Sequence, residues 1–292
     1  MTNTPTDAGH GRAAGGLELL TTGRVSVDLY AEQLELALND VRSFRKSVGG
    51  TATNVAVAAA RLGHHAAVLT KVGDDPMGRY IRHALEHTFG VDTGYVDTHP
   101  KLRTPLAFAT MEDPAEPVID FYRDPQAPDM TITAEGLDPG VVAEVPIFWF
   151  TTSGLSAEPS RATLHQLLAW RDRRPHTVLD LDWRPAFWPH AGAATTELDR
   201  VLDRVTIAIG NRAECEVAVG ETDPDRAADA LLGRGLDGAI VKLGGDGVLV
   251  ATADGARERI PPYSVEVVCG LGAGDAFGGA VCHGLLSGWD LV

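Results

Sequence analysis

The 292-residue sequence contains only three cysteines, and no apolar run approaches the length that spans a membrane. Cys215, Cys269 and Cys282 lack the paired or metal-ligand spacing that predicts disulfides or a zinc site. We interpret them as buried reduced thiols, which are typical of a cytoplasmic protein. Residues 1–16 have no apolar core, so they are predicted to form a disordered leader and not a signal peptide.

Basic residues are also scarce. There are 25 Lys and Arg against 40 Asp and Glu, which gives a formal net charge of −15. An acidic surface argues against nucleic acid or an anionic membrane as a partner, although a local cluster of Arg and Lys can still bind an anionic small molecule. Composition is otherwise that of a globular protein, with 44% hydrophobic and 22% charged residues. This length and composition predict one sizeable α/β domain.

Short apolar segments alternate with helical patterns along most of the chain, which predicts βαβ crossovers. The expected strands are residues 17–23, 66–72, 147–152, 177–181, 205–209 and 239–243, and the expected helices include 53–62, 158–171, 195–202 and 224–233. Crossovers of this kind build a mostly parallel sheet that is covered by helices on both faces. We therefore predict a single α/β domain over residues 17–292.

One region breaks this alternation. Residues 41–48, 104–111 and 118–123 resemble strands with interleaved polar residues, and a turn-rich loop at 112–117 joins the last two. A small β-sheet inserted into the α/β body, from strands at about 41–48 and 104–123, accounts for this pattern. Such a sheet can act as a lid that excludes water from a reactive site.

The most informative motif is Gly272-Ala273-Gly274-Asp275, which lies between a β-rich run and an apolar helix of small residues. The glycines allow a tight turn that directs backbone N–H groups into one concavity at the helix N-terminus, which suits a phosphoryl group. Asp275 beside that anion could accept a proton from an attacking hydroxyl. On these four residues alone, a tight turn with a capping carboxylate explains the motif equally well.

Further polar motifs follow other predicted strands. Asp28 comes after the first strand, and Gly49-Gly50 precedes the helix that carries Asn54. Carboxylates and amides at such positions can hold the hydroxyls of a polyol, because ligands of open α/β sheets bind at the carboxyl ends of the strands. Considered singly, Asp28 could equally be a solvated loop residue, and Gly49-Gly50 is better explained as a helix N-terminus.

Three more motifs suit an anion or a nucleotide. Arg184, in Asp180-Leu181-Asp182-Trp183-Arg184-Pro185, could hold a carboxylate or phosphate with its planar guanidinium. Asn211 and Glu214 open a helix and could lie near a Mg²⁺–phosphate group. Lys242 is followed by Gly244 and Gly247 in a glycine-rich turn that suits contact with a nucleotide.

The motif around Gly49, Gly50 and Asn54 and the motif 272–275 together resemble the two signatures of the ribokinase (PfkB) family of carbohydrate kinases. The resemblance covers nearly the whole chain after residue 16. It implies a ribokinase-like fold, in which a mostly parallel central sheet flanked by helices carries a small β-sheet lid. The implied reaction transfers the γ-phosphoryl group of ATP, with Mg²⁺, to a primary hydroxyl of a small-molecule sugar.

The resemblance also implies a role for each motif. Asp275 is the expected base, and the amides of Gly272, Ala273 and Gly274 are the expected anion hole. The residues expected to bind the sugar are Asp28, Gly49, Gly50, Asn54, Arg123 and Arg184. The residues expected to bind ATP are Asn211, Glu214, Lys242, Gly244 and Gly247, with Glu214 as an indirect Mg²⁺ ligand.

Within this family, residues 24–30, 121–123 and 180–185 resemble the 5-dehydro-2-deoxygluconokinases of inositol catabolism. The substrate of that group is a keto sugar acid, and Arg123 and Arg184 are expected to neutralise its carboxylate. Two related activities, those of 2-keto-3-deoxygluconate kinase and of fructokinase, remain open. A dehydrogenase of the Rossmann type is disfavoured, because Gly23-Arg24-Val25-Ser26 lacks the dinucleotide-type glycine triplet.

Two departures from the family pattern add further expectations. Cys269-Gly270-Leu271 stands where many relatives have Asp-Thr-Thr, so the sequence does not predict the monovalent cation site of some members. The chain stops at Val292, before a further helix that family members have, and a catalytically impaired sugar-binding fragment is therefore an alternative. Exposed edges of the lid also predict a homodimer.

Overall fold

The computed structural model describes residues 16–33, 35–110, 118–265 and 270–292. The predicted disordered leader lies outside these residues except for Gly16, and so do Cys269 and the predicted loop at 112–117. None of the helices in the described part of the chain combines the length and apolar character needed to cross a membrane.

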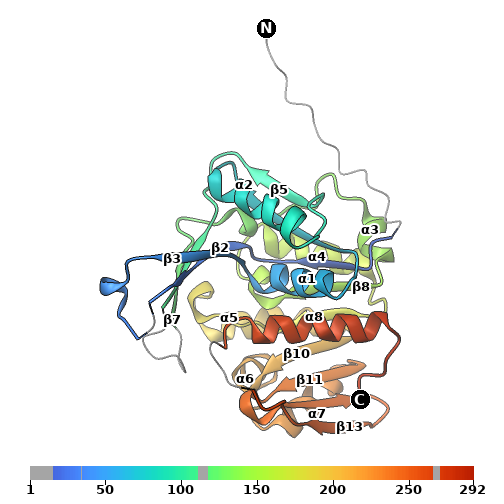
Figure 1. Ribbon diagram of the computed structural model, residues 1–292. Helices are drawn as coiled ribbons and strands as arrows, with labels where there is room; N and C mark the ends of the chain where they lie inside the picture. Colours follow the sequence, from blue (N-terminus) through green and yellow to red (C-terminus); the bar gives the residue numbers. More distant parts are fainter. Residues whose placement is uncertain (1–15, 34, 111–117, 266–269) are drawn as a thin grey trace.

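A nine-stranded sheet forms the centre of the molecule (Figure 1). Seven neighbouring strands are parallel, and two antiparallel strands extend one edge. Their spatial order is β13 (Arg257–Ile260), β12 (Val248–Thr252), β11 (Gly238–Lys242), β10 (Ile207–Asn211), β9 (Thr177–Asp180), β8 (Ile147–Thr151), β1 (Leu19–Thr22), β4 (Ala66–Gly73) and β5 (Val96–His99). The predicted mostly parallel sheet is thus confirmed.

Helices cover both faces of this sheet. Because side chains alternate along a strand, neighbouring residues enter opposite cores: Leu20 and Phe148 pack in one, Leu19 and Trp149 in the other. The first core receives side chains from α3 (Pro139–Glu144), α4 (Ser160–Arg171), α5 (Ala191–Asp199), α6 (Arg212–Val219) and α7 (Pro224–Gly233). The second receives them from α1 (Thr51–Arg61), α2 (Pro76–His83) and α8 (Ala273–Leu286).

Glycines set the position of α8, the helix that carries the 272–275 motif. Gly278 lies against the ring of Trp149, and Gly279 lies so close to α1 that an added Cβ would overlap Ala58. The two helices therefore run side by side on one face of the sheet, as Figure 1 shows. This close packing fixes the N-terminus of α8 relative to the N-terminal turns of α1.

A second, four-stranded sheet projects from the α/β body (Figure 1). Its order is β3 (Phe44–Gly49), β2 (Ser26–Ala31), β6 (Leu106–Thr110) and β7 (Val118–Tyr122). The strands expected at 41–48, 104–111 and 118–123 correspond to β3, β6 and β7. Strand β2 was not among those expected from the sequence, in which Asp28 was considered only as a residue that follows the first strand. The alternation of Val27 and Leu29 with polar neighbours was the available signal.

Candidate active site

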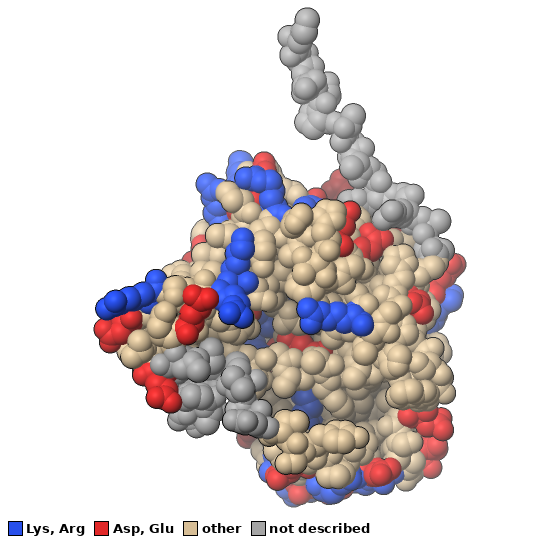
Figure 2. All heavy atoms as spheres, viewed as in Figure 1, with Lys and Arg blue, Asp and Glu red and all other residues tan. Residues whose placement is uncertain are grey.

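A cavity of about 390 Å³ lies between the small sheet and the carboxyl ends of the large sheet's parallel strands. In Figure 2, acidic and basic atoms are visible in the recesses near the centre of the face shown. The lining residues that the sequence predicted for the site are Asp28, Gly50, Asn54, Arg184, Asn211, Glu214, Lys242, Gly244, Gly272, Gly274 and Asp275. The polar lining residues that were not assigned a role are Arg24, Ser26, Tyr30, Thr51, Asp180 and Asp182. One cavity therefore gathers motifs that lie far apart in the sequence.

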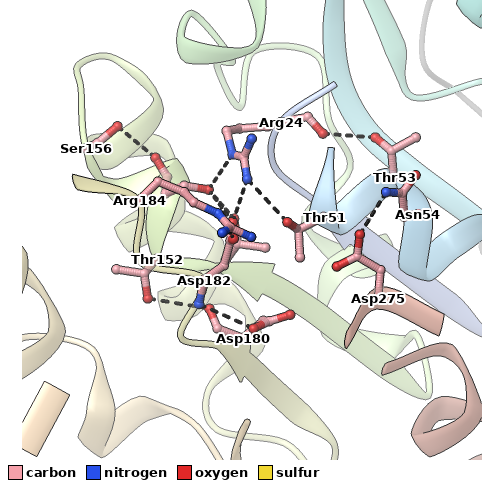
Figure 3. A network of polar contacts seen from close by, with 12 residues as sticks. Arg24, Thr51, Thr53, Asn54, Thr152, Ser156, Asp180, Asp182, Arg184 and Asp275 are labelled. Carbon is pink, nitrogen blue, oxygen red and sulfur yellow. Dashed lines mark hydrogen bonds and ion pairs between the residues drawn. The ribbon is translucent and has the colours of Figure 1, made fainter. Parts of the chain in front are cut away.

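Asp275 lies in the first turn of α8 and faces α1. Its Oδ2 accepts a hydrogen bond of 2.7 Å from Nδ2 of Asn54 (Figure 3). Burial raises the pKa of Asp275 to about 6, the bond from Asn54 opposes this rise, and the charge of Asp182 adds to it. A carboxylate with a pKa near the operating pH can both accept and release a proton, as a general base must.

The N-terminus of α8 offers amides for an anion. Gly272 takes a left-handed conformation with φ of +78° just before the helix, and this turn favours glycine. The amide of Ala273 donates to the carbonyl of Gly270 at 3.3 Å. Within the described residues, the amides of Gly272, Gly274 and Asp275 have no such backbone partner. Of the three amides predicted for the anion hole, those of Gly272 and Gly274 therefore remain available to an anion, whereas that of Ala273 is engaged.

Asp28 reaches the cavity from β2 of the small sheet. Its Oδ1 accepts a hydrogen bond of 2.6 Å from Ser26 Oγ, and burial raises its pKa against the effect of that bond. Gly49 does not line the cavity, but a Cβ at this position would overlap the carboxylate of Asp28. Gly50 has φ of +103°, and a Cβ there would overlap the carbonyl of Arg24. The glycine pair thus makes room for Asp28 and for the chain after β1.

Two arginines share one buried carboxylate at the floor of the site (Figure 3). Asp182 Oδ2 lies 2.9 Å from Arg24 Nη2, and Asp182 Oδ1 lies 3.0 Å from Arg184 Nε. Burial alone would raise the pKa of Asp182, but the two guanidinium groups outweigh it and hold the pKa below its usual value. Asp182 therefore remains ionised, and it anchors both cations at the edge of the cavity.

Arg123, predicted to bind substrate, does not line the cavity. Its guanidinium pairs with Asp129, which is fully buried and also accepts the amide of Val25 at 2.8 Å. Arg123 thus ties β7 to the segment between β1 and β2. Arg24, just after β1, lines the cavity, although the sequence assigned it no role in binding.

The residues predicted for the nucleotide surround the ends of β10 and β11. Asn211 and Glu214 form a reciprocal capping box, in which Asn211 Oδ1 accepts the amide of Glu214 at 2.9 Å and Glu214 Oε2 accepts that of Asn211 at 2.7 Å. Lys242 Nζ lies 3.6 Å from Glu214 Oε2 and 3.7 Å from Asp180 Oδ1. Burial alone would lower the pKa of Lys242, but the attraction of these two carboxylates is stronger than the effect of burial, so the pKa is raised.

The two glycines after Lys242 differ in their roles. Gly244 lines the cavity and has open space around it. Gly247 does not line the cavity, and a Cβ there would overlap the carbonyl of Ile260 on β13. Its φ of +88° also requires glycine. Gly247 therefore shapes the turn between β11 and β12, while Gly244 remains available to a ligand.

The chemistry of the donors around β10 fits Mg²⁺ bound chiefly through phosphates. In the described part of the chain, no group of three or more His, Cys, Asp or Glu forms a metal site. Mg²⁺ in kinases binds through one or two carboxylates, waters and substrate phosphates, so a complete protein cage is not required. Glu214 supplies a carboxylate beside the cavity, as such an indirect site needs.

Comparison with known proteins agrees with this geometry. Residues 17–292 match the model of the pfkB family of carbohydrate kinases. The chain is 34% identical over 282 residues to a 5-dehydro-2-deoxygluconokinase of Photobacterium profundum, covering 94% of this chain and 84% of the relative. Crystal structures of two proteins are similar in fold. A PfkB protein from Polaromonas has a TM-score of 0.83 and 22% identity, covering 94% of this chain and 90% of that one.

The second is a sugar kinase from Pyrococcus horikoshii in complex with ATP, with a TM-score of 0.75 and 25% identity, covering 92% of this chain and 84% of that one. The small sheet above the central sheet corresponds to the predicted lid of the ribokinase-like fold. The family match spans nearly all of the chain, including both predicted signature motifs. The chain belongs to the pfkB family of carbohydrate kinases and is a sugar kinase.

Proposed function

We propose that the protein transfers the γ-phosphoryl group of ATP to a primary hydroxyl of 5-dehydro-2-deoxygluconate, a sugar acid of inositol catabolism. The observation that carries this proposal is the position of Asp275, a half-buried carboxylate held by Asn54 beside the N-terminus of α8 and inside the cavity. A base and an anion site within one cavity are the two parts that phosphoryl transfer to a hydroxyl requires.

Asp275 would accept the proton of the substrate hydroxyl as its oxygen attacks the γ-phosphorus. The bond to the β-phosphate oxygen breaks, and ADP carries away the electron pair. The amides of Gly272, Gly274 and Asp275, which have no backbone partner among the described residues, would stabilise the charge that develops on the phosphoryl group, and the positive end of the helix dipole would add to their effect. Asp28 and Asn54 would orient the sugar hydroxyls from opposite sides.

Lys242, Gly244 and the end of β10 would hold the nucleotide. Lys242 is a fixed cation beside the cavity, because Asp180 and Glu214 flank its ammonium group. Mg²⁺, when bound with ATP, would neutralise charge on the phosphates, and Glu214 with Asn211 would hold it indirectly. Burial raises the pKa of Asp180, which reduces the negative charge that faces the phosphates at neutral pH.

The sugar-acid substrate is supported by the similarity to 5-dehydro-2-deoxygluconokinases and by the cations at the floor of the cavity. Arg184 lines the cavity, and its Nε donates to Asp182. A fructokinase or 2-keto-3-deoxygluconate kinase would share the same phosphoryl-transfer residues. The alternatives therefore differ in the acceptor and not in the reaction.

The test is a coupled assay of ADP release with Mg-ATP on 5-dehydro-2-deoxygluconate, 2-keto-3-deoxygluconate, fructose and ribose. We expect the highest kcat/KM on the first sugar, and a fall in kcat of roughly 100- to 10,000-fold in Asp275→Asn. A higher kcat/KM on fructose or ribose would contradict the sugar-acid assignment. Sugar binding without turnover by a folded wild-type protein would instead favour the impaired, sugar-binding alternative.

We further propose that the enzyme is cytoplasmic and forms a homodimer through its small sheet. Cys215 and Cys282 are buried and unpaired, as the reducing cytoplasm favours. Strand β7 is an edge of the small sheet and exposes Val118 and Tyr122. Light scattering on the purified protein tests the pairing: a dimer that Val118→Lys converts to a monomer is expected, and a monomeric wild type would contradict it.

A further inference from the structure

Arg24 is a buried cation in the cavity wall for which the phosphoryl-transfer chemistry supplies no role. Its side chain is 5% exposed, yet it lines the cavity. Among the residues that the structure describes, Nε donates to Ser153 Oγ at 2.9 Å and Nη2 donates to Thr51 and Asp182, which leaves Nη1 without a partner. A buried guanidinium with an unused donor is costly unless a ligand completes it.

The surroundings of Arg24 hold its guanidinium in one orientation. The ring of Phe187 lies 4.8 Å from its Cζ, and the ring of Phe121 lies 5.8 Å away. Phe121 belongs to β7, so the small sheet packs over the arginine from above. Since the side chain is already fixed, binding an anion there costs little further conformational entropy.

Both arginines bind the same carboxylate and keep donors to spare. Arg24 and Arg184 pair with Asp182, which uses one oxygen for each arginine. Among the described residues, Asp28 forms no ion pair with either arginine and its Oδ1 accepts from Ser26, although the charge of Arg24 opposes the rise in the pKa of Asp28. The donors that Asp182 leaves unused are therefore open to a second carboxylate.

Position in the sheet separates this charge from the nucleotide residues. Arg24 follows β1 and Lys242 ends β11, and these strands are four steps apart in the sheet. With adjacent strands about 4.8 Å apart, β1 and β11 lie about 19 Å apart, and the guanidinium of Arg24 reaches across to Asp182 after β9, two strands from β11. Arg24 therefore lies at the acceptor side of the cavity, together with Ser26, Asp28 and Tyr30 of β2, and away from the residues proposed for ATP.

We propose that Arg24 is a specificity-determining residue whose guanidinium, together with that of Arg184, binds the carboxylate of the sugar-acid acceptor. This inference rests on the function proposed above. It assigns the carboxylate to Arg24 in place of Arg123, which pairs with Asp129 through Nη2 and does not line the cavity. A pair of guanidinium groups spaced by one carboxylate can contact both oxygens of a second carboxylate.

The test compares the sugar acid with its carboxamide, which has nearly the same shape and no charge. Inhibition or turnover constants for both are measured in the wild type, Arg24→Lys and Arg123→Lys, with the exposed Arg234→Lys as a preparation control. We expect the wild type to prefer the acid, and Arg24→Lys to lose about 10- to 100-fold of that preference. The KM for ATP should stay within about twofold.

General damage to the fold would weaken binding of the acid and the amide alike, so the ratio isolates the contact with the carboxylate. Should Arg24→Lys fail to fold, Thr51→Val removes a support of the guanidinium without leaving Asp182 unpaired, and a smaller loss of preference is expected. An unchanged ratio in Arg24→Lys, or a loss in Arg123→Lys alone, overturns the inference.

Two outcomes locate a failure elsewhere. A wild type that turns over neutral sugars but not the acid refutes the proposed function before any variant is considered. An Arg24→Lys variant with a lower kcat and a higher KM for ATP, but an unchanged ratio of acid to amide, would place Arg24 on the phosphoryl group and overturn its assignment to the acceptor.

Discussion

The carboxamide of Asn54 donates a 2.7 Å hydrogen bond to the carboxylate of Asp275 and so joins α1 to α8 across 221 residues of sequence. The bond orients the proposed base, and it also stabilises the base's ionised form. Asn54 thus affects the pKa of Asp275, in addition to its proposed contact with the sugar.

Replacing Asn54 by Leu should move the pH dependence of the reaction. Asp275 must be ionised to accept a proton, so kcat/KM should fall as the pH drops through about 6 in the wild type. Without the bond from Asn54, which lowers the pKa of Asp275, that fall should begin at a higher pH. Steady-state kinetics between pH 5 and 9 measure the shift. An acid limb that stays in place, or moves to lower pH, would contradict the role of Asn54.

The motifs on either side of this bond were predictable because they are local in sequence. Glycines next to a capping or catalytic residue, as at 272–275, specify a backbone conformation that short segments determine by themselves. The choice between Arg24 and Arg123 was not local, because it depends on which buried carboxylate each arginine meets. Asp182 is 158 positions from Arg24, and only the packed sheet brings the two together. Asp129 is just six positions from Arg123, but its burial depends on the same packing.

The omission of β2 has a related cause. Ser26–Ala31 is half-buried and follows β1 after a short turn, so its pattern resembles a loop that leads away from a strand. Its pairing with β3 and β6 involves residues up to about eighty positions away, which a local pattern does not reveal.

Lys242→Met should weaken ATP binding more than sugar binding. The change removes the cation that faces Asp180 and Glu214 and leaves those carboxylates to repel the phosphates. We expect the KM for ATP to rise about 10-fold or more, with a smaller change in the KM for the sugar acid. Lys242→Arg keeps the charge and should retain most of the affinity. Equal effects on both substrates would contradict the assignment of Lys242 to the nucleotide.

Gly49→Ala should displace Asp28 without replacing it. The new Cβ would overlap the carboxylate of Asp28, whose side chain must then rotate away from Ser26. We expect the KM for the sugar to rise about 10-fold, with little change in the KM for ATP. Gly233→Ala is the matched control, because its Cβ meets no atom within 4 Å. Wild-type kinetics in Gly49→Ala would show that Asp28 does not orient the sugar.

Asp275→Asn should make the folded protein more stable at alkaline pH while it removes activity. Burial raises the pKa of Asp275 from 3.8 to about 6, so the ionised form is disfavoured in the folded state. In the wild type, the contribution of Asp275 to the free energy of unfolding is greatest below the pKa that this residue has in the unfolded chain. That contribution is lost as the pH rises through about 6. The variant lacks this loss, and it should exceed the wild type by about 1–3 kcal/mol at pH 8. Near pH 4 the difference should nearly vanish.

Replacing Asp182 should change stability in the opposite direction to replacing Asp275, because Arg24 and Arg184 hold the pKa of Asp182 low. Asp182→Asn leaves both guanidinium groups without their shared anion, and it should destabilise the protein at pH 8 by about 3–5 kcal/mol. Urea unfolding of the three proteins at pH 4.5 and 8 measures both effects. If Asp275→Asn were less stable than the wild type at pH 8, the ionised carboxylate of Asp275 would stabilise the folded protein. That result would contradict the proposal that the site holds this base at a cost in stability. A preorganised site predicts this pair of effects. Ionised Asp275 lowers the stability of the folded protein, and the ion pairs of Asp182 with its two arginines offset that loss.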